Sequence, residues 1–417
     1  MKQIKIEGGH ILSGEIKVSG AKNSAVALVP ASILCDEEVI IDNIPNISDI
    51  DALKEILNHL GAKIKEDDSM LSIDPTSINN REIPEEISKK LRASYYFMGA
   101  ILGKYKRAEM YFPGGCSIGA RPIDLHLKGF EALGAKVINE NNKYIVDADE
   151  LKGANIYLDI ASVGATINIM LAAVRAKGRT IIDNAAKEPE IVNVATFLNN
   201  MGAKIRGAGT STIKIQGVDH LHKCFHEVIP DRIEAGTYII IGALCGDNLK
   251  VSNLIPEHIE SLLSKLDEIG VNIDVGADYV VVSRGEKYRA TNIKTLVYPG
   301  FPTDLQQPFT TLLTQCKGKS KVTETIWENR FMHVPYLSNM GADIVIKNQT
   351  ATIIGPTKLK GAEVVATDLR AGAAMVTAAL IADGKSRITN VEHILRGYEN
   401  IIEKLRNVGA KIELNEI

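Results

Sequence analysis

The sequence has few cysteines and no long apolar run. Its five cysteines lie at positions 35, 116, 224, 245 and 316. They form no CxxC pair and no even set, which fits free thiols in a reducing cytosol better than the disulfides of a secreted protein or a zinc site. The longest apolar runs, such as Tyr238 to Cys245, are too short to span a bilayer, and Met1 leads directly into the alternating pattern Ile4-Ile6 instead of a signal peptide. We therefore expect a cytoplasmic protein with no membrane partner.

The sequence also lacks a charge excess and the common cofactor motifs. Lys plus Arg number 48 and Asp plus Glu 51, with no run of like charge, so a nucleic-acid groove or a polybasic membrane patch is not indicated. There is no P-loop, no GxGxxG after a strand, no HExxH and no EF-hand pattern, so we expect neither cofactor nor metal. His220, His222 and His226 lie close together, but no acid matches them, and we interpret them as surface residues. Small molecules are the expected partners.

One short phrase recurs six times along the chain. Its copies are Leu60-Gly-Ala-Lys-Ile64, Leu133-Gly-Ala-Lys-Val137, Met201-Gly-Ala-Lys-Ile205, Ile269-Gly-Val-Asn-Ile273, Met340-Gly-Ala-Asp-Ile344 and Val408-Gly-Ala-Lys-Ile412. The glycines lie 73, 68, 68, 71 and 68 residues apart, a regularity that indicates an internal repeat. Each copy ends a segment with helical periodicity, so each glycine is predicted to cap a helix before a strand.

The rest of the repeat is a small-residue helix followed by a β-branched strand. The helices are predicted to open at Ala21-Lys22-Asn23-Ser24, Arg92-Ala93-Ser94, Ser162-Val163-Gly164-Ala165-Thr166, Asp231-Arg232-Ile233, Thr303-Asp304-Leu305-Gln306-Gln307 and Asp368-Leu369-Arg370. The Ala-rich stretches 165–173 and 371–379 read as helices buried on all sides. The sequence therefore predicts an α/β protein of two domains, each with three repeats about a pseudo-threefold axis, whose polar helix openings face a common cleft.

The second repeat contains a loop with a candidate reactive thiol. The stretch Pro113-Gly114-Gly115-Cys116 is followed by Ile118-Gly119-Ala120-Arg121-Pro122, so a flexible glycine loop places a guanidinium five residues from the thiol. A nearby cation favours thiolate over thiol, and such a thiol can give or take a proton. The alternative is an inert cysteine in a glycine-rich turn, since free cysteines are often small buried apolar residues.

The helix openings and the segments next to them carry mostly cations. Besides Cys116, the set is Lys22, Asn23, Arg92, Arg121, Asp304, Arg330, Asp368, Arg370 and Arg396. A single arginine on a helix is usually solvated, but five arginines and a lysine at equivalent edges of related repeats indicate a multiply anionic ligand. Two acids, Asp304 and Asp368, stand among them. An acid among cations stays ionised and can accept a proton from a substrate hydroxyl, with the thiol as proton donor.

These residues resemble those of the bacterial UDP-N-acetylglucosamine 1-carboxyvinyltransferases, which belong to the enolpyruvyl transferase family. The similarity runs along the whole chain. Besides the Lys22 opening, the cysteine loop and the Ser162 and Asp368 openings, it is carried by Asn184-Ala185-Ala186 with Glu188-Pro189-Glu190, Phe301-Pro302-Thr303-Asp304, Glu328-Asn329-Arg330-Phe331-Met332-His333 and Arg396-Gly397-Tyr398-Glu399.

The resemblance implies an α/β fold of two inside-out α/β barrels, each of three repeats, joined by a double crossover. The first domain would span 22–229, and the second 1–21 with 230–417. The implied reaction moves the enolpyruvyl group of phosphoenolpyruvate to the 3-hydroxyl of UDP-N-acetylglucosamine and releases phosphate, by addition and then elimination. It is the first committed step of peptidoglycan synthesis.

The resemblance also implies roles for single residues. Cys116 would be the proton donor and the thiol that fosfomycin attacks, and Asp304 the base at the sugar hydroxyl. The phosphoenolpyruvate site would comprise Lys22, Asn23, Arg121 and Arg396, with Lys22 and Arg396 also catalytic. The nucleotide-sugar site would comprise Asn23, Arg92, Arg121, Pro122, Ile123, Asp124, Leu125, Ser162, Val163, Gly164, Asp304 and Ile326. Arg330, Asp368 and Arg370 would support the intermediate and domain closure.

The chain departs from some family members at a few positions. It has Ile160 and Ala161 where they have Lys and Val, and Tyr96, which we expect to stack on a ligand, where they have Trp. Two other functions stay open from the residues alone. A 5-enolpyruvylshikimate-3-phosphate synthase shares the repeats but lacks the Gly-Gly-Cys loop, and a non-catalytic sensor of an anionic metabolite would not need Cys116, Asp304 and Lys22 together.

Overall fold

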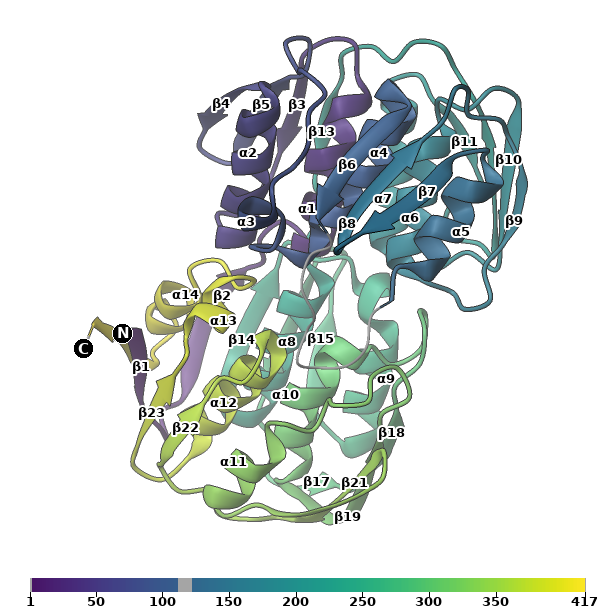
Figure 1. Ribbon diagram of the computed structural model, residues 1–417. Coiled ribbons are helices and arrows are strands. Elements are labelled where there is room, and N and C mark those ends of the chain that lie inside the picture. The colour runs from purple at the N-terminus through teal and green to yellow at the C-terminus, as the bar shows by residue number, and fades with distance from the viewer. Residues whose placement is uncertain (1, 112–121, 417) are drawn as a thin grey trace. The chain divides into compact units, whose positions relative to one another are not determined.

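The structure is a computed structural model that describes residues 2–111 and 122–416 (Figure 1). Cys116 and Arg121 lie outside these residues. The described residues divide into two compact units: the first spans 20–111 and 122–229, and the second spans 2–19 and 230–416. Within the described part of the chain, no helix is both long and apolar enough to cross a membrane.

Strands of the described residues form six sheets, three in each unit. The first unit has the sheets β4-β5-β3-β13, β7-β8-β6 and β11-β12-β10-β9, built from β3 (Val39–Asp42), β4 (Lys63–Asp67), β5 (Met70–Asp74), β6 (Arg107–Tyr111), β7 (Lys136–Glu140), β8 (Lys143–Asp147), β9 (Asn155–Tyr157), β10 (Arg179–Asp183), β11 (Lys204–Arg206), β12 (Thr212–Gln216) and β13 (Phe225–Glu227).

The second unit has the sheets β15-β16-β14-β2, β20-β21-β19-β17 and β24-β1-β23-β22, with β18 also paired to β19. Their strands are β1 (Lys2–Glu7), β2 (Leu12–Lys17), β14 (Gly246–Ser252), β15 (Asn272–Val275), β16 (Tyr279–Ser283), β17 (Tyr288–Arg289), β18 (Asn292–Lys294), β19 (Cys316–Thr323), β20 (Asp343–Lys347), β21 (Thr350–Gly355), β22 (Glu363–Val365), β23 (Lys385–Thr389) and β24 (Lys411–Glu416).

All six sheets share the order of three of their strands, which shows that the repeat in the sequence is a repeat in the structure. The strand after each Gly-Ala phrase pairs antiparallel with a second strand, and this pairs antiparallel with the strand that follows a buried helix. In the sixth sheet the first two strands of this order come from opposite ends of the chain, because β24 pairs with β1 and β1 pairs with β23. Both termini lie at this sheet in Figure 1. The predicted alternation of strands and helices is confirmed.

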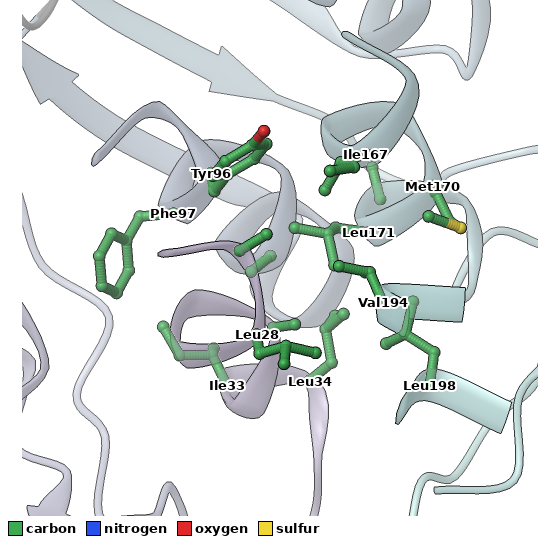
Figure 2. Close-up of a cluster of buried hydrophobic side chains, with 14 of the residues drawn as sticks. Leu28, Ile33, Leu34, Tyr96, Phe97, Ile167, Met170, Leu171, Val194 and Leu198 are labelled. Atoms are coloured by element: carbon green, nitrogen blue, oxygen red, sulfur yellow. The ribbon is translucent and has the colours of Figure 1, made fainter. Parts of the chain in front are cut away.

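Each unit has buried helices and helices that cover its sheets. The buried ones are α1 (Lys22–Ala31), α4 (Tyr96–Tyr105) and α6 (Val163–Ala173) in the first unit, and α8 (Arg232–Cys245), α10 (Thr303–Leu313) and α12 (Leu369–Ile381) in the second. Residues 165–173 and 371–379 are all buried, as their composition predicts. Small residues allow the close approach: a Cβ on Gly99 of α4 would lie 2.2 Å from Oδ1 of Asn168 of α6. Figure 2 shows the large side chains packed beside these two helices.

The outer helices end at the six repeated glycines. They are α2 (Ser48–Leu60), α5 (Asp124–Ala132), α7 (Pro189–Asn200), α9 (Glu260–Ile269), α11 (Val334–Asn339) and α14 (Ile401–Asn407), and α3 (Glu85–Ser88) and α13 (Glu392–Leu395) are single short turns. The glycines at 61, 134, 202, 270, 341 and 409 all have φ between 91° and 109°, a left-handed conformation that glycine adopts without strain. The predicted glycine caps are confirmed.

The interpretation of His226 as a surface residue is wrong. His226 is only 6% exposed, whereas its neighbour Phe225 is 58% exposed. The reason is the register of β13, which pairs in parallel with β3 so that His226 lies beside Ile41 and Phe225 beside Ile40. Neighbouring residues of paired strands share a face, and Ile41 faces the core. His220 and His222 are exposed, as expected.

Candidate functional site

Acidic residues begin the buried helices of the second unit. Asp231 caps α8, because its Oδ1 accepts hydrogen bonds from the N–H groups of Ile233 (2.8 Å) and Glu234 (3.0 Å). Asp368 caps α12 in the same way, with Oδ1 accepting from Arg370 (2.8 Å) and Ala371 (3.0 Å). Such caps satisfy N–H groups that the helix itself leaves without partners. The capped openings hold the first turn of each helix in place.

Asp304, in the first turn of α10, is held between two guanidinium groups. Nη2 of Arg330 donates to Oδ1 at 2.6 Å, and Nη2 of Arg370 donates to Oδ2 at 3.2 Å. The two arginine side chains are 3% and 4% exposed, whereas that of Asp304 is 27% exposed. Ion pairs of buried arginines are strong and directional, so the carboxylate is fixed in orientation yet reachable by a ligand.

The environment of Arg370 keeps its positive charge. Burial alone would lower the pKa of Arg370, but Tyr398, Asp304 and Asp231 outweigh it, and the net pKa is raised. The guanidinium carbon lies 5.3 Å from the centre of the Tyr398 ring, within the range of a cation–π contact. Asp231, at the opening of α8, therefore acts on the same guanidinium as Asp304, and the three helix openings of this unit meet at Arg370.

The chain segment that carries Arg330 is anchored by a buried acid that the sequence analysis did not single out. Oε1 of Glu324, which is 1% exposed, accepts from the Ile326 N–H (2.8 Å) and the Trp327 N–H (3.2 Å). Its Oε2 accepts from Oγ1 of Thr303 (2.9 Å), the residue before Asp304. Glu324 thus joins the proposed nucleotide-sugar residue Ile326 to the opening of α10. An acid directly after a β-branched strand was the available signal.

His333 lies deep in the same region. It is fully buried, and burial lowers the pKa of its imidazole to about 3, with Asp368 opposing the shift and Arg330 adding to it. The ring is therefore neutral at physiological pH. The neutral imidazole of His333 therefore adds no charge to the group formed by Asp304, Arg330 and Arg370.

In the first unit, Lys22 is the first residue of α1, and its ammonium forms an ion pair with Asp49 at 2.9 Å. The side chain of Lys22 is 14% exposed and that of Asp49 is 3% exposed. Asn23 beside it is half-buried. A buried acid thus fixes the position of this cation. The pairing could not be predicted from local spacing, because Asp49 lies in another helix, α2.

The other openings of the first unit meet around His126. Gly164 lies in the first turn of α6, after the cap Ser162, and a Cβ there would lie 2.9 Å from the Tyr95 hydroxyl and 3.2 Å from Nε2 of His126. The rings of Tyr95 and His126 are in edge contact, with centroids 4.9 Å apart. Burial and the charge of Arg92 lower the pKa of His126 to about 3. The predicted segments at 92, 124 and 162 are therefore close together.

Asn168 fixes which nitrogen of His126 carries the proton. The Gly99 N–H donates to Oδ1 of Asn168 at 2.9 Å, so the amide nitrogen points the other way and donates to the Tyr95 carbonyl (2.9 Å) and to Nδ1 of His126 (3.0 Å). Nδ1 is then an acceptor, and Nε2 carries the proton toward Gly164. Asn168 is a second residue that the sequence analysis missed, because it lies inside an otherwise apolar helix.

Of the two tyrosines at the opening of α4, one faces the core. Tyr96 is 4% exposed and packs in the core shown in Figure 2, so the prediction that it stacks on a ligand is wrong. The helix at this opening begins with a 3-10 turn, Arg92–Tyr95, and this turn leaves Tyr95 half-buried beside Gly164 while Tyr96 faces inward. Ile160, two residues before the cap Ser162, is 67% exposed.

The remaining predicted residues lie at or near helix ends. Pro122 and Asp124 are exposed, Leu125 and Val163 are half-buried, and Ile123 is buried directly before α5. Arg396 follows α13 and is half-buried. The structure thus brings together Asp304, Arg330, Asp368 and Arg370 in the second unit, and Arg92, His126 and Gly164 in the first. The prediction for Cys116 and Arg121 falls on residues that are not described.

The chain is similar to proteins of known function along almost its full length. A sequence model of the EPSP synthase (3-phosphoshikimate 1-carboxyvinyltransferase) family matches residues 6–405. UDP-N-acetylglucosamine 1-carboxyvinyltransferase 2 of Listeria monocytogenes is 56% identical over 407 residues, which cover 98% of this chain and 96% of the relative. The protein of the same name from Geobacillus kaustophilus is 57% identical over 412 residues, covering 99% and 96%.

Solved structures agree with these matches. The enolpyruvyl transferase NikO from Streptomyces tendae superposes with a TM-score of 0.90 at 27% identity, covering 99% of both chains. EPSP synthase from Acinetobacter baumannii has a TM-score of 0.77 at 16% identity over the full length of both chains, and this likeness shows the fold alone. The chain therefore belongs to the enolpyruvyl transferase family of EPSP synthase, and within it to the UDP-N-acetylglucosamine 1-carboxyvinyltransferases.

Proposed function

We propose that this chain transfers the enolpyruvyl group of phosphoenolpyruvate to the 3-hydroxyl of UDP-N-acetylglucosamine and releases phosphate, the first committed step of peptidoglycan synthesis. The observation that carries the proposal is the carboxylate of Asp304, oriented by two buried guanidinium groups and itself 27% exposed. A fixed, ionised and accessible carboxylate is the group needed to take a proton from a sugar hydroxyl. The 56% identity to enzymes with this name supports the choice of substrates.

The proposed reaction has two steps. In the addition, Asp304 takes the proton of the 3-hydroxyl as its oxygen bonds to C2 of phosphoenolpyruvate, and Cys116 gives a proton to C3. In the elimination, the methyl group so formed returns a proton to the Cys116 thiolate, the bond from C2 to the phosphate oxygen breaks with its electrons on that oxygen, and the phosphate takes the proton held by Asp304. The enolpyruvyl ether and phosphate remain. The anionic intermediate needs cations around it, and we assign this role to Arg330 and Arg370, with Asp368 holding Arg370 in place.

The other assignments follow the resemblance, residue by residue. Lys22, Asn23, Arg121 and Arg396 bind phosphoenolpyruvate. Arg92, Pro122 to Leu125, Ser162 to Gly164 and Ile326 bind the nucleotide sugar, together with Asn23, Arg121 and Asp304. The ion pair of Lys22 with Asp49 supports the first assignment, because it holds a cation ready at a helix N-terminus, where an anion is favoured.

We also propose that each unit is an inside-out barrel of three repeats about a pseudo-threefold axis, with domain limits 22–229 and 1–21 plus 230–417. The shared strand order of the sheets and the burial of α8, α10 and α12 support this arrangement. Cytoplasmic location fits the free thiols of the four described cysteines.

Phosphate release tests the reaction directly. The purified protein is incubated with phosphoenolpyruvate and either UDP-N-acetylglucosamine or shikimate 3-phosphate. We expect phosphate release only with the nucleotide sugar. Release only with shikimate 3-phosphate would favour the alternative synthase, and specific binding without release would favour a sensor.

Fosfomycin tests the proposed reactivity of the thiol. We expect intact-mass spectrometry after incubation to show one covalent adduct, located on Cys116 by peptide mapping. Cys35, Cys245 and Cys316 serve as internal controls, because they are buried and burial raises the pKa of each thiol. A protein with full activity and no adduct would contradict the role of Cys116.

A further inference from the structure

Gln307 lies one helical turn after Asp304 on α10 and is fully buried. Residues three apart on a helix lie on the same face, so the glutamine side chain stands behind the carboxylate. Buried glutamine is uncommon unless its amide makes hydrogen bonds. The contacts of this amide therefore indicate why a polar residue occupies a core position.

The amide nitrogen of Gln307 joins the two segments that hold Asp304. It donates to the Arg330 carbonyl oxygen at 3.2 Å and to Oδ2 of Asp368 at 3.3 Å. Both partners can only accept, so they fix which end of the amide carries the nitrogen. The first contact holds the backbone of Arg330, and the second holds the carboxylate whose other oxygen caps Arg370.

We propose that Gln307 is a positioning residue, which keeps both guanidinium groups in place on Asp304. The inference rests on the proposed function, in which Asp304 is the base. Through one side chain, α10, the segment before α11 and the opening of α12 are held in a single geometry. Gln307 contacts no substrate in this scheme, and it acts on the reaction only through Arg330 and Asp368.

The expected effect follows from what the two contacts fix. Without the amide, the Arg330 carbonyl and the Asp368 carboxylate each lose a donor, and the two guanidinium groups gain freedom to shift relative to the carboxylate. A misplacement of about 1 Å can reduce an enzymatic rate about 100-fold. Binding of the nucleotide sugar involves many other residues, so the loss should appear in kcat and much less in KM.

The test compares Gln307→Met with the wild-type enzyme and with a matched control. Methionine keeps the volume and removes both donors. The control is Gln315→Met, because Gln315, two residues after the end of α10, also makes two amide hydrogen bonds, to Thr314 Oγ1 (2.8 Å) and the Thr357 carbonyl (3.0 Å), and neither partner is one of the two arginines that hold Asp304. We expect Q307M to lower kcat about 10- to 100-fold with KM for UDP-N-acetylglucosamine within about twofold, and Q315M to retain wild-type kcat.

A double-mutant cycle separates positioning from a general structural role. Product formation is followed by mass spectrometry over hours, so that slow turnover is measured. If Gln307 acts by holding the arginines on Asp304, then Q307M lowers the residual turnover of Asp304→Asn by a smaller factor than it lowers wild-type turnover, because only the contacts of the arginines with the intermediate remain to be lost. An equal loss in both backgrounds, or wild-type kcat in Q307M, would overturn the inference.

If Q307M does not fold, as judged by its thermal unfolding, Gln307→Ala is measured instead, since its smaller side chain cannot clash with its neighbours and donates to neither partner. Wild-type kcat in that variant overturns the inference. Failure of the proposed function is seen separately, as absence of phosphate release by the wild-type enzyme. If only shikimate 3-phosphate supports release, the same cycle is measured with that acceptor.

Discussion

Protonation of His126 in the unfolded state should reduce the stability of the folded protein as the pH falls from neutral to 5. The imidazole is 5% exposed, Nδ1 accepts from the Asn168 amide at 3.0 Å, and Arg92 lies close enough to repel a second charge. Burial is the largest of these effects, and together they lower the pKa from 6.5 to about 3. For its imidazole to become charged in the folded protein, His126 must lose the hydrogen bond that Asn168 donates to Nδ1.

The sign and size follow from proton linkage. The folded-state pKa lies below the unfolded value, so between pH 3 and 6.5 the unfolded state binds more protons than the folded state. The stability is fully present above the unfolded pKa and is lost as the pH falls, by about 1.4 kcal/mol per pH unit below 6.5. Between pH 7.5 and 5 this amounts to about 2 kcal/mol for this one residue.

The measurement is urea unfolding of the wild type and of His126→Gln at several pH values from 5 to 7.5. The difference between the pH dependences of the two proteins reports the contribution of His126 alone, because every other titrating group is common to both. We expect the free energy of unfolding of the variant to fall by about 2 kcal/mol less over this range. His220→Gln is the control, since the His220 side chain is 89% exposed, and it should keep the wild-type pH dependence. Identical pH dependence in H126Q and the wild type would refute the reasoning.

The same reasoning extends to two other buried histidines. Burial lowers the pKa of His226 to about 4 and that of His333 to about 3. Their contributions have the same sign as that of His126, so the three together should reduce stability by about 6 kcal/mol at pH 5. Two of them lie in the first unit and one in the second. The three histidines should therefore reduce stability in acid in both units, opposed in the second unit by Glu234, whose pKa burial raises to about 7.

Substitutions at three other positions test the site and the helix packing. Asp304→Asn should lower kcat about 100- to 10,000-fold while nucleotide-sugar affinity, measured by calorimetry, changes much less, because the amide cannot accept the hydroxyl proton; an unchanged kcat would exclude Asp304 as the base. Cys116→Ser should lower turnover strongly with unchanged thermal unfolding, since a hydroxyl is a much weaker acid than a thiol, and undiminished turnover would show that the thiol is not needed. Gly99→Ala should reduce stability by about 1–3 kcal/mol in urea unfolding, because its Cβ would lie 2.2 Å from Oδ1 and 2.3 Å from the backbone oxygen of Asn168; a neutral effect would show that α4 and α6 can separate freely.

Features that depend on local spacing could be predicted from the sequence. The six glycine caps follow from one residue type at a fixed place after a helical pattern, and all six have the left-handed conformation. The burial of residues 165–173 and 371–379 follows from composition alone. The grouping of Asp304, Arg330 and Arg370 was also accessible, because equivalent ends of repeated units tend to come together.

Features that depend on pairing between distant segments could not be predicted. His226 is buried and Phe225 exposed because of the register between β13 and β3, which lie far apart in the sequence. In the same way, which of Tyr95 and Tyr96 faces the core depends on how the 3-10 turn Arg92–Tyr95 leads into α4. The contacts of Gln307 join three segments, and its position in the sequence gives no indication of either acceptor.

Comparison of the three helix openings of the second unit explains why one acid among three is suited to catalysis. Asp231 and Asp368 occupy the cap positions of α8 and α12, and each commits Oδ1 to two N–H groups of its own helix. At α10 the cap position holds Pro302, whose side chain cannot accept a hydrogen bond, and Asp304 lies two residues further on. Its carboxylate is therefore not used as a cap, and its oxygens are held by side-chain guanidinium groups that a substrate can approach from the exposed side. A shift of the acid by two positions in one repeat thus converts a residue that stabilises a helix into one that can exchange a proton.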